Sequence, residues 1–398
     1  MKDKKTIDER VVQGTNESSQ TKEKNVSLRR IFVPVNGIYK RFPKQKDFVL
    51  TLSLDHSAEL GILTYNNESV ILDEKQTKIL KAKMYKKNLK ITKMYQPVLD
   101  MLVKLHTEYH KEHNISLRML KRNLENLTIQ KKPGYLKKVD GAYLISGNTL
   151  SLRYYKPKNE MDSLNKTQTL SHEIGHMTFG EMDTDGEYLI DKGGVSTGKY
   201  RIFEAIELDN NKGFLIDIDE TSYTCYGYGI EEALNEEYSL RVLGFDVSQY
   251  NSAGQLIEYI VGTRTCDIAR SKHDLNMIKA KFVELIPDGA KFDELIENLD
   301  NVFDDNKKCS KKERAESEVK SMSILADYVL KKVETELKTG KFKKSKYEKI
   351  SEWRIPFHLN KDLEILEIND RLNESVEKLV NQYKPKKVST PITQTKEK

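Results

Sequence analysis

Residues 172–176 have the types and the spacing that metal-assisted hydrolysis requires. The stretch His172-Glu173-Ile174-Gly175-His176 follows the pattern HExxH. In a helix His172 and His176 lie one turn apart on the same face, where both imidazoles can reach one Zn²⁺ at about 2.0–2.1 Å. Glu173 lies beside them without being needed as a ligand, which is where a general base for activating water belongs.

The opposite side of the same predicted helix is apolar. Leu170, Ile174 and Met177 recur at i, i+4 and i+7, a stripe suited to burial. A charged surface helix that carries two histidines by chance is the alternative interpretation. The uncharged residues at 174, 175, 177 and 178 count against it, and we therefore expect this helix to lie inside a domain.

A hydrolytic zinc site needs a third protein ligand and an open position for water. The compact metzincin extension needs glycine at 179 and histidine at 182, but the chain has Phe179 and Met182. The other histidines lack a surrounding motif, although His273 stays open as a candidate. They are His56, His106, His110, His113, His273 and His358.

A second predicted helix, over residues 229–240, offers carboxylates. Glu232 and Glu236 lie one turn apart, beside an apolar stripe that includes Ile230 and Leu234. One carboxylate from this helix would complete a His₂Glu ligand set. The other could accept the N–H of a ligand histidine and so fix its tautomer.

An HExxH pattern followed by Glu231-Glu232-Ala233-Leu234 and Glu236 resembles the gluzincin branch of the zincin metallopeptidases. It is similar in particular to uncharacterised bacterial members with a second helix like NEGLTEYLT. The resemblance covers about residues 140–245. In two places the chain departs from the pattern: Ala233 stands for the usual glycine, and Glu237 for an apolar or aromatic residue.

The resemblance implies a zinc ion bound by His172, His176 and Glu232. It also implies Glu173 as the base that activates water, and Glu236 as the carboxylate behind a ligand histidine. The reaction would be hydrolysis of a peptide bond in a protein or peptide substrate.

Such a reaction also needs a donor for the developing oxyanion. Tyr223, Tyr226 and Tyr228 come just before the second helix, and His273 comes after it. Any of the four could serve, and the sequence does not choose among them.

The predicted class is α+β, with a zincin-like catalytic domain built on a small antiparallel sheet and the HExxH helix, followed by a mostly helical C-terminal region. We expect a disordered tail at 1–28, a mixed α/β region at 29–135, a zincin-like core at 136–245, a helical subdomain at 246–383 and a second disordered tail at 384–398.

Periodicity predicts the elements inside these regions. Strands are expected at 31–35, 48–54 and 60–65, and hairpins at 142–155 and 199–219. Helices are expected within 75–130 and at 230–242, 253–270, 273–285, 291–303, 313–337 and 361–382. Pro97 fits its helix only in the first turn. The first hairpin should provide an edge strand, with which a substrate peptide could pair.

Two further patterns have simpler explanations. His106, His110 and His113 are spaced four and three residues apart among charged residues, which predicts a solvated helix end. Residues 181–186 resemble the start of a calcium loop, but the twelfth position is Lys192 instead of glutamate, so a solvated acidic turn is expected.

The composition limits the remaining classes. The chain has 398 residues, 32% charged residues and a net charge of +6, which does not by itself imply nucleic acid. Three cysteines without a CxxC pair predict reduced thiols. With no visible secretory signal and no apolar run of about 20 residues, we expect a cytoplasmic protein without a membrane span, although leaderless export leaves no readable trace.

Two alternatives to a general peptidase remain. One is a regulatory HExxH peptidase that clips a single protein partner. The other is a non-catalytic helical binding protein that uses lysines interleaved with aromatics at 338–347, a stretch that is otherwise a solvated linker. The sequence leaves the oligomeric state open.

Overall fold

The computed structural model describes residues 28–34, 62–65, 68–71, 74–125, 127–131, 140–145, 148–153, 158–207, 213–245, 252–304, 306–351 and 362–383. The predicted strand 48–54 and, except for Leu28, the predicted tails lie outside these residues. The chain divides into two compact units, Met1–Cys225 and Tyr226–Lys398. The predicted α+β class is confirmed, while the five predicted segments remain a prediction.

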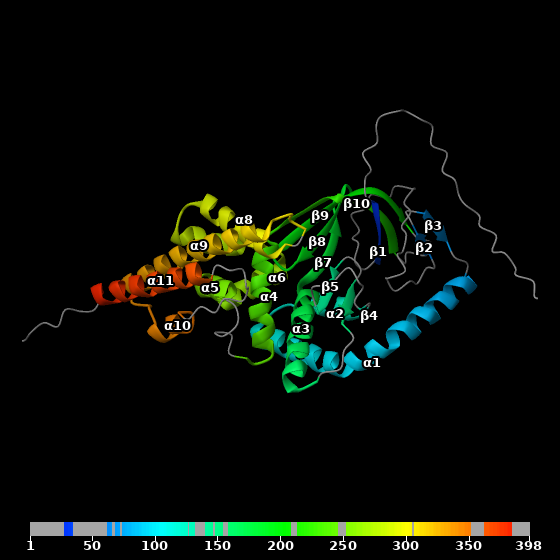
Figure 1. Ribbon diagram of the computed structural model, residues 1–398, viewed down its shortest axis with the longest axis horizontal. Helices are drawn as coiled ribbons and strands as arrows, with labels where there is room; N and C mark the ends of the chain where they lie inside the picture. Colours follow the sequence, from blue (N-terminus) through cyan, green and yellow to red (C-terminus); the bar gives the residue numbers. More distant parts are fainter. Residues whose placement is uncertain are drawn as a thin grey trace, which may run out of the picture. The chain divides into compact units, whose positions relative to one another are not determined.

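The first unit contains a five-stranded sheet, drawn mostly in green in Figure 1. Its order is β1 (Leu28–Pro34), β10 (Gly213–Tyr226), β9 (Ser196–Glu207), β8 (Tyr188–Gly193) and β7 (Gly180–Thr184). The strands β9 and β10 are neighbours, as the second predicted hairpin requires. A separate two-stranded sheet joins β2 (Ile62–Tyr65) to β3 (Glu68–Ile71).

A three-stranded sheet completes the first unit, in the order β4 (Thr128–Lys131), β6 (Thr149–Leu152), β5 (Gly141–Leu144). The strands β5 and β6 pair in antiparallel fashion, which confirms the first predicted hairpin. The strand β5 lies at an edge, as predicted. The sheet is mixed, because β4 runs parallel to β6, and this pairing was not predicted.

Three helices accompany these sheets: α1 (Glu74–His113), α2 (Arg118–Glu125) and α3 (Glu160–Phe179). The predicted place of Pro97 in a first turn is wrong, because α1 runs through it without interruption. Pro97 is exposed, and the helix lacks one backbone hydrogen bond there because proline has no N–H. One face of α1 is apolar and buried, with Tyr95, Leu99 and Leu102 inside.

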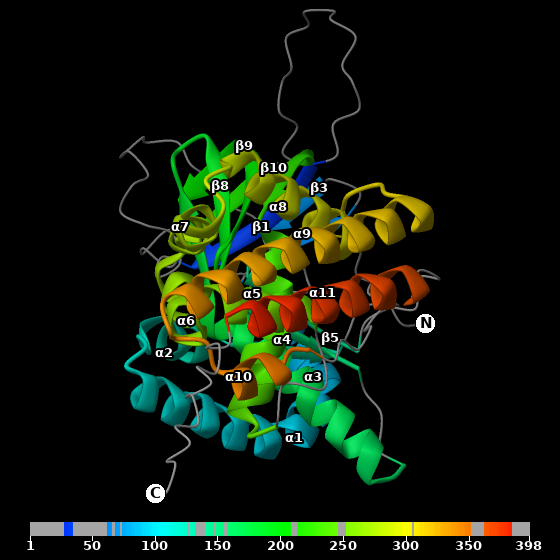
Figure 2. The ribbon, with the colours of Figure 1, turned by 90° about the vertical axis from the view of Figure 1, so that its left-hand side faces the viewer.

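The described part of the second unit is helical, and several of its helices run side by side in Figure 2. They are α4 (Tyr228–Val242), α5 (Ser252–Val261), α6 (Thr263–Lys272), α7 (Leu275–Leu285), α8 (Gly289–Phe303), α9 (Lys311–Lys338), α10 (Lys344–Glu348) and α11 (Asp362–Gln382). The predicted single helix over 253–270 is divided at Gly262, whose φ of 96° no continuing helix adopts.

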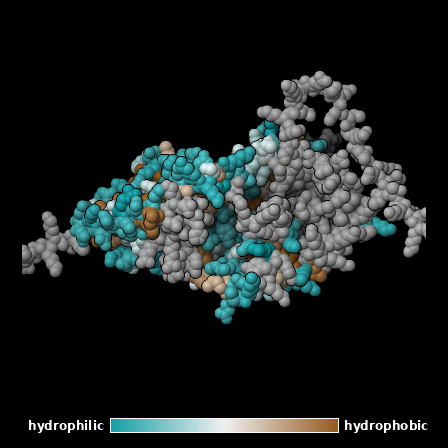
Figure 3. All heavy atoms as spheres, in the orientation of Figure 1, coloured by the Kyte–Doolittle hydropathy of each residue, from teal (hydrophilic) through white to brown (hydrophobic). Residues whose placement is uncertain are grey.

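The core of the second unit is partly aromatic. The rings of Phe282, Phe292 and Tyr328 meet at centroid distances of 5.0 and 4.7 Å. Hydrophilic residues cover much of the coloured surface in Figure 3. Within the described ranges, no helix has the length and apolar character needed to cross a membrane.

Candidate metal centre

The HExxH residues occupy the last two turns of α3. The side chain of Asn159 caps the start of this helix by accepting a hydrogen bond from the Asp162 N–H. Leu170, Ile174 and Met177 are buried, which confirms the predicted apolar stripe. Burial of this face fixes the rotation of the helix about its own axis.

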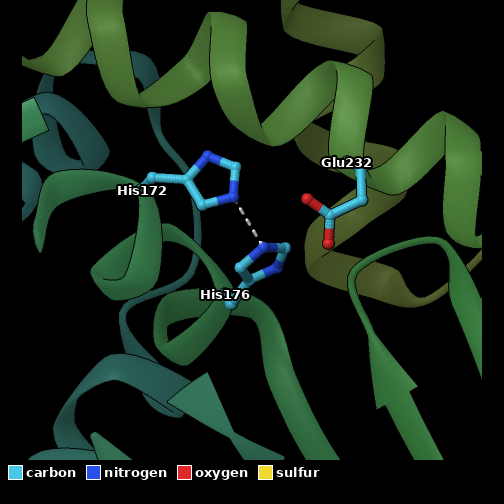
Figure 4. Close-up of side chains that lie close together, drawn as sticks. All are labelled: His172, His176 and Glu232. Atoms are coloured by element: carbon cyan, nitrogen blue, oxygen red, sulfur yellow. Dashed lines mark hydrogen bonds between the residues drawn. The ribbon is translucent and has the colours of Figure 1, made fainter. Parts of the chain in front are cut away.

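His172 and His176 face each other across one turn of α3. Their Nε2 atoms lie 3.0 Å apart, and the two rings meet edge to face at a centroid distance of 4.7 Å (Figure 4). Two nitrogens bound to one tetrahedral zinc at about 2.0–2.1 Å lie about 3.3 Å apart. A shift of a few tenths of an ångström therefore suits this pair to a shared ion.

Glu232 is the third member of the group. One oxygen of its carboxylate and one nitrogen of each of the two histidines all lie within 4.8 Å of one another. Figure 4 shows these three labelled side chains pointing toward a common point. Two imidazoles and one carboxylate are the donor types that zinc accepts, so the residues fit this ion.

The carboxylate of Glu173 is hydrogen-bonded to a strand of the three-stranded sheet. Its side chain is buried, and its Oε2 accepts a 2.6 Å hydrogen bond from the backbone N–H of Tyr143 on β5. Gly141, two residues earlier, makes this approach possible, because a Cβ there would lie 3.2 Å from Cγ of Glu173. The edge strand and the motif helix are thus in close contact.

The start of α4, where Glu232 lies, depends on a distant carboxylate. Gly227 at the N-cap has a left-handed φ of 80° and no capping side chain of its own. Instead, Asp300 of α8 accepts hydrogen bonds from the N–H groups of Gly227 and Gly229, at 3.0 and 2.7 Å. Burial raises the pKa of Asp300, and these two N–H groups act in the opposite direction.

The inner face of α4 is held by ion pairs. Arg270 of α6 is buried and binds both carboxylate oxygens of Glu231 and the side-chain oxygen of Asn235. Its guanidinium also lies 5.0 Å from the ring centroid of Tyr238. These contacts fix the rotation of α4 and leave Glu232, the next residue after Glu231, half-buried.

The other predicted site residues are not members of the three-residue group. Glu236 is half-buried, one turn after Glu232 on α4, and Tyr228 is the first residue of that helix. His273 ends α6 with a left-handed φ of 54°. Tyr226 is exposed, and its hydroxyl donates to Asp293. Their predicted roles remain predictions.

Asp191 was missed by the sequence reasoning. On β8 it lies opposite Met182 of β7, and cross-strand partners share a face. Gly180, two residues before Met182, is on this same face, where a Cβ would lie 2.8 Å from the carbonyl oxygen of His176. Burial raises the pKa of Asp191 to about 7, opposed by the charge of His176.

Tyr223 lies on the same face of the sheet as Asp191. Gly198 is the β9 partner of Asp191, and a Cβ on Gly198 would lie 2.9 Å from the Tyr223 hydroxyl. The ring stacks on Tyr200 at a centroid distance of 4.4 Å. Burial is the main cause that raises the pKa of Tyr223. Tyr223 was one of the four candidate oxyanion donors, whereas no local pattern in the sequence distinguishes Asp191 from other acids.

The solvated helix end predicted for residues 106–113 is wrong for two of its histidines. His106 is buried, with its Nε2 3.2 Å from Oγ of Ser171. His110 is also buried, and its Nδ1 lies 3.0 Å from the Ser116 carbonyl oxygen. The face of α1 toward α3 carries these rings, while its charged residues at 111 and 112 are exposed.

The predicted acidic turn after α3 is a hairpin between β7 and β8. Asp185 at its tip is exposed, as predicted. Glu181 and Asp183 are instead buried and form ion pairs with Arg122 at 3.1 Å and Lys192 at 2.9 Å. The acidic side chains of β7 are therefore part of the packing.

The lysine-rich stretch 338–347 combines exposed lysines with one buried aromatic ring. Tyr347 is buried and donates to Asn373 of α11, so this aromatic ring serves packing. Lys346 lies over the ring of Tyr259, and Lys338 pairs with Glu334.

Comparisons of the chain with the profiles of known protein families, with curated proteins and with solved structures give no match.

Proposed function

We propose that this protein is a zinc-dependent metallopeptidase of the gluzincin type, with a zincin-like catalytic domain. The observation that carries the proposal is the group of His172, His176 and Glu232, whose donor atoms lie within 4.8 Å of one another. These are the donors of a His₂Glu hydrolytic site, and two of them come from an HExxH helix.

Zinc bound to such a group supplies a Lewis acid that polarises a scissile carbonyl and makes water more acidic. Glu173 is the residue that takes the proton from the attacking water and returns it to the leaving amine. Glu232 balances part of the positive charge. Glu236 is proposed to accept the N–H of a ligand histidine and so keep its other nitrogen available.

A protein or peptide substrate suits the strand beside the site. The strand β5 lies at the edge of its sheet and contacts the motif helix through Tyr143 and Glu173. Edge strands present unpaired backbone groups, and an extended peptide can add to them as a further strand. We propose that the scissile peptide pairs with β5 at backbone groups other than the Tyr143 N–H, which Glu173 already accepts.

The test measures zinc and hydrolysis in the same preparations. We expect about one zinc per chain and cleavage of an unfolded protein substrate by the wild type. Glu173→Gln should keep zinc and lower kcat about 10³-fold, the usual size of a general-base effect. Glu232→Ala should lose the metal. Glu160→Gln, on an exposed residue of the same helix, is the matched control and should change neither.

Two results would contradict the proposal. Unchanged hydrolysis by Glu173→Gln would exclude this residue as the base. Full zinc occupancy in Glu232→Ala would exclude the third ligand. A substrate screen then separates a general peptidase, which cuts many unfolded proteins, from a regulatory one, which cuts a single partner.

A further inference from the structure

We infer that Tyr143 is a positioning residue for Glu173, holding the carboxylate through its backbone N–H while its own side chain ties the edge strand to the end of the motif helix. This inference rests on the proposed function, in which Glu173 is the general base. It adds to that function a second element, β5, whose role is to place the base.

The contact with Glu173 is short and protected from water. The backbone N–H of Tyr143 donates to Oε2 of Glu173 at 2.6 Å, and both residues are buried. Gly141 lies against the same helix, since a Cβ there would lie 3.1 Å from Cγ2 of Thr169 and 3.2 Å from Cγ of Glu173. A charge-assisted bond in such surroundings is stronger than one between neutral groups.

The Tyr143 N–H is available because of its place in the sheet. Tyr143 pairs with Leu150 of β6, and β5 is at the sheet edge. In an antiparallel strand the backbone groups of successive residues point alternately toward the partner strand and away from it. Because the Tyr143 N–H bonds to Glu173, it points away from β6. Removing this N–H therefore costs no bond of the β5–β6 ladder.

The side chain of Tyr143 takes part in a series of hydrogen bonds that connects β5 with the end of α3. Its hydroxyl donates to Oδ1 of Asn148 at 2.8 Å, and Nδ2 of Asn148 donates to the Asn123 carbonyl oxygen at 2.7 Å. Nδ2 of Asn123 in turn donates to the carbonyl oxygens of Met177 and Gly180, at 2.7 and 2.9 Å. This series of hydrogen bonds begins at Glu173 on α3 and returns to the C-terminal end of the same helix.

This arrangement has a consequence for catalysis. A glutamate side chain has three rotatable bonds, and an unrestrained carboxylate samples several positions. Displacement of a catalytic group by about 1 Å can cost about 100-fold in rate. The Tyr143 N–H restricts Glu173 to one position, and the bonds through Asn148 and Asn123 keep β5 at a fixed distance from α3.

Three substitutions at one position separate the two contacts. Tyr143→Phe removes the hydroxyl alone, Tyr143→Ala removes the side chain and keeps the N–H, and Tyr143→Pro removes both. Proline is tolerated where a strand N–H points away from its neighbour. We expect Tyr143→Pro to have a kcat about 100-fold below that of Tyr143→Ala at similar KM, per zinc-loaded chain.

Ser151→Ala is the matched control. It removes another buried hydroxyl of the same sheet, which accepts from Gln130 and has no link to Glu173. Tyr143→Phe should lower kcat several-fold, whereas Ser151→Ala should affect stability alone. Equal kcat values for folded Tyr143→Pro and Tyr143→Ala would overturn the inference.

A measurement without catalysis completes the test. The Tyr143 amide should exchange its hydrogen slowly in the wild type and at least about tenfold faster in Glu173→Ala, because the acceptor is gone. Equal exchange rates would overturn the inference, even if Tyr143→Pro does not fold. If the wild type hydrolyses no peptide, the proposed function fails, while slow exchange would still support the contact.

Discussion

Two pairs of histidines with the same spacing lie on helices that pack against each other in the first unit. His106 and His110 on α1 are four residues apart, as are His172 and His176 on α3. The first pair is buried, and each ring is hydrogen-bonded to a different group, a serine hydroxyl and a backbone carbonyl. In the second pair the two Nε2 atoms point at each other, 3.0 Å apart.

The difference shows that a spacing of four residues on a helix is not sufficient to bring two histidine nitrogens together and that the surroundings decide the outcome. The rings on α1 are packed in the interior and form hydrogen bonds that hold α1 to its neighbours. His110 also lies against Phe179, at a centroid distance of 5.5 Å. The rings on α3 converge, and a carboxylate oxygen of Glu232 lies near both.

The largest effect should come from removing a converging ring. We expect His176→Ala to weaken zinc binding about 10³-fold, because each ligand of a zinc site contributes roughly 3–4 kcal/mol of its total affinity. Hydrolysis should fall with it. Competition with a chelator of known affinity measures the change, and zinc binding at wild-type strength would show that the pair is not a ligand pair.

A substitution on α1 should have a smaller effect, and it should change stability instead of zinc binding. His110→Ala removes the ring beside Phe179 and leaves a cavity, which should lower the free energy of unfolding by about 2–4 kcal/mol. Zinc per folded chain should stay at the wild-type value. Urea unfolding and metal analysis measure the two quantities, and a loss of zinc from the folded variant would remove the contrast between the pairs.

Two buried glutamates on α4 differ in whether their carboxylates have hydrogen-bond partners. Glu231 and Glu237 are both fully buried, but Glu231 pairs with Arg270. Among the described residues, neither carboxylate oxygen of Glu237 has a hydrogen-bond partner. Burial, with the nearby charge of Glu258, raises the pKa of Glu237 to about 10. The folded protein therefore holds a proton there at neutral pH.

The smallest predicted effect is on the pH dependence of stability, and it follows from the proton on Glu237. Between about pH 4.5 and 10 the unfolded chain has lost the Glu237 proton and the folded chain retains it, so stability falls as pH rises. From pH 7 to 8 this contributes a loss of about 1 kcal/mol, which Glu237→Gln should abolish. Glu334→Gln is the control, because the pKa of Glu334 is lowered to about 2 and does not affect this window. Equal slopes for Glu237→Gln and wild type would contradict this prediction.

Local patterns predicted much of the fold. The helical stripe of Leu170, Ile174 and Met177, the hairpin of β5 and β6 and most helices of the second unit follow from periodicity of 3.6 or 2. The local HExxH pattern was enough to propose His172 and His176 as ligands, whereas Glu232 was chosen over Glu236 through the resemblance to gluzincins.

The remaining features depend on contacts between residues far apart in the sequence. Three such features have no pattern among residues that are neighbours in the sequence. They are the parallel pairing of β4 with β6, the burial of His106 against Ser171 and the place of Asp191 beside α3. The hydrogen bond between Tyr143 and Glu173 spans 30 positions and uses a backbone group, which no side-chain pattern reveals.

The cap on α4 has a consequence for how the second unit forms. Because the N–H groups of Gly227 and Gly229 are satisfied by Asp300, the first turn of α4 is complete only after α8 has been made and docked. During synthesis, a chain that ends before Asp300 has a frayed start to this helix. If Glu232 is a metal ligand as proposed, capture of the ion by this residue follows the docking of α8 and cannot guide it.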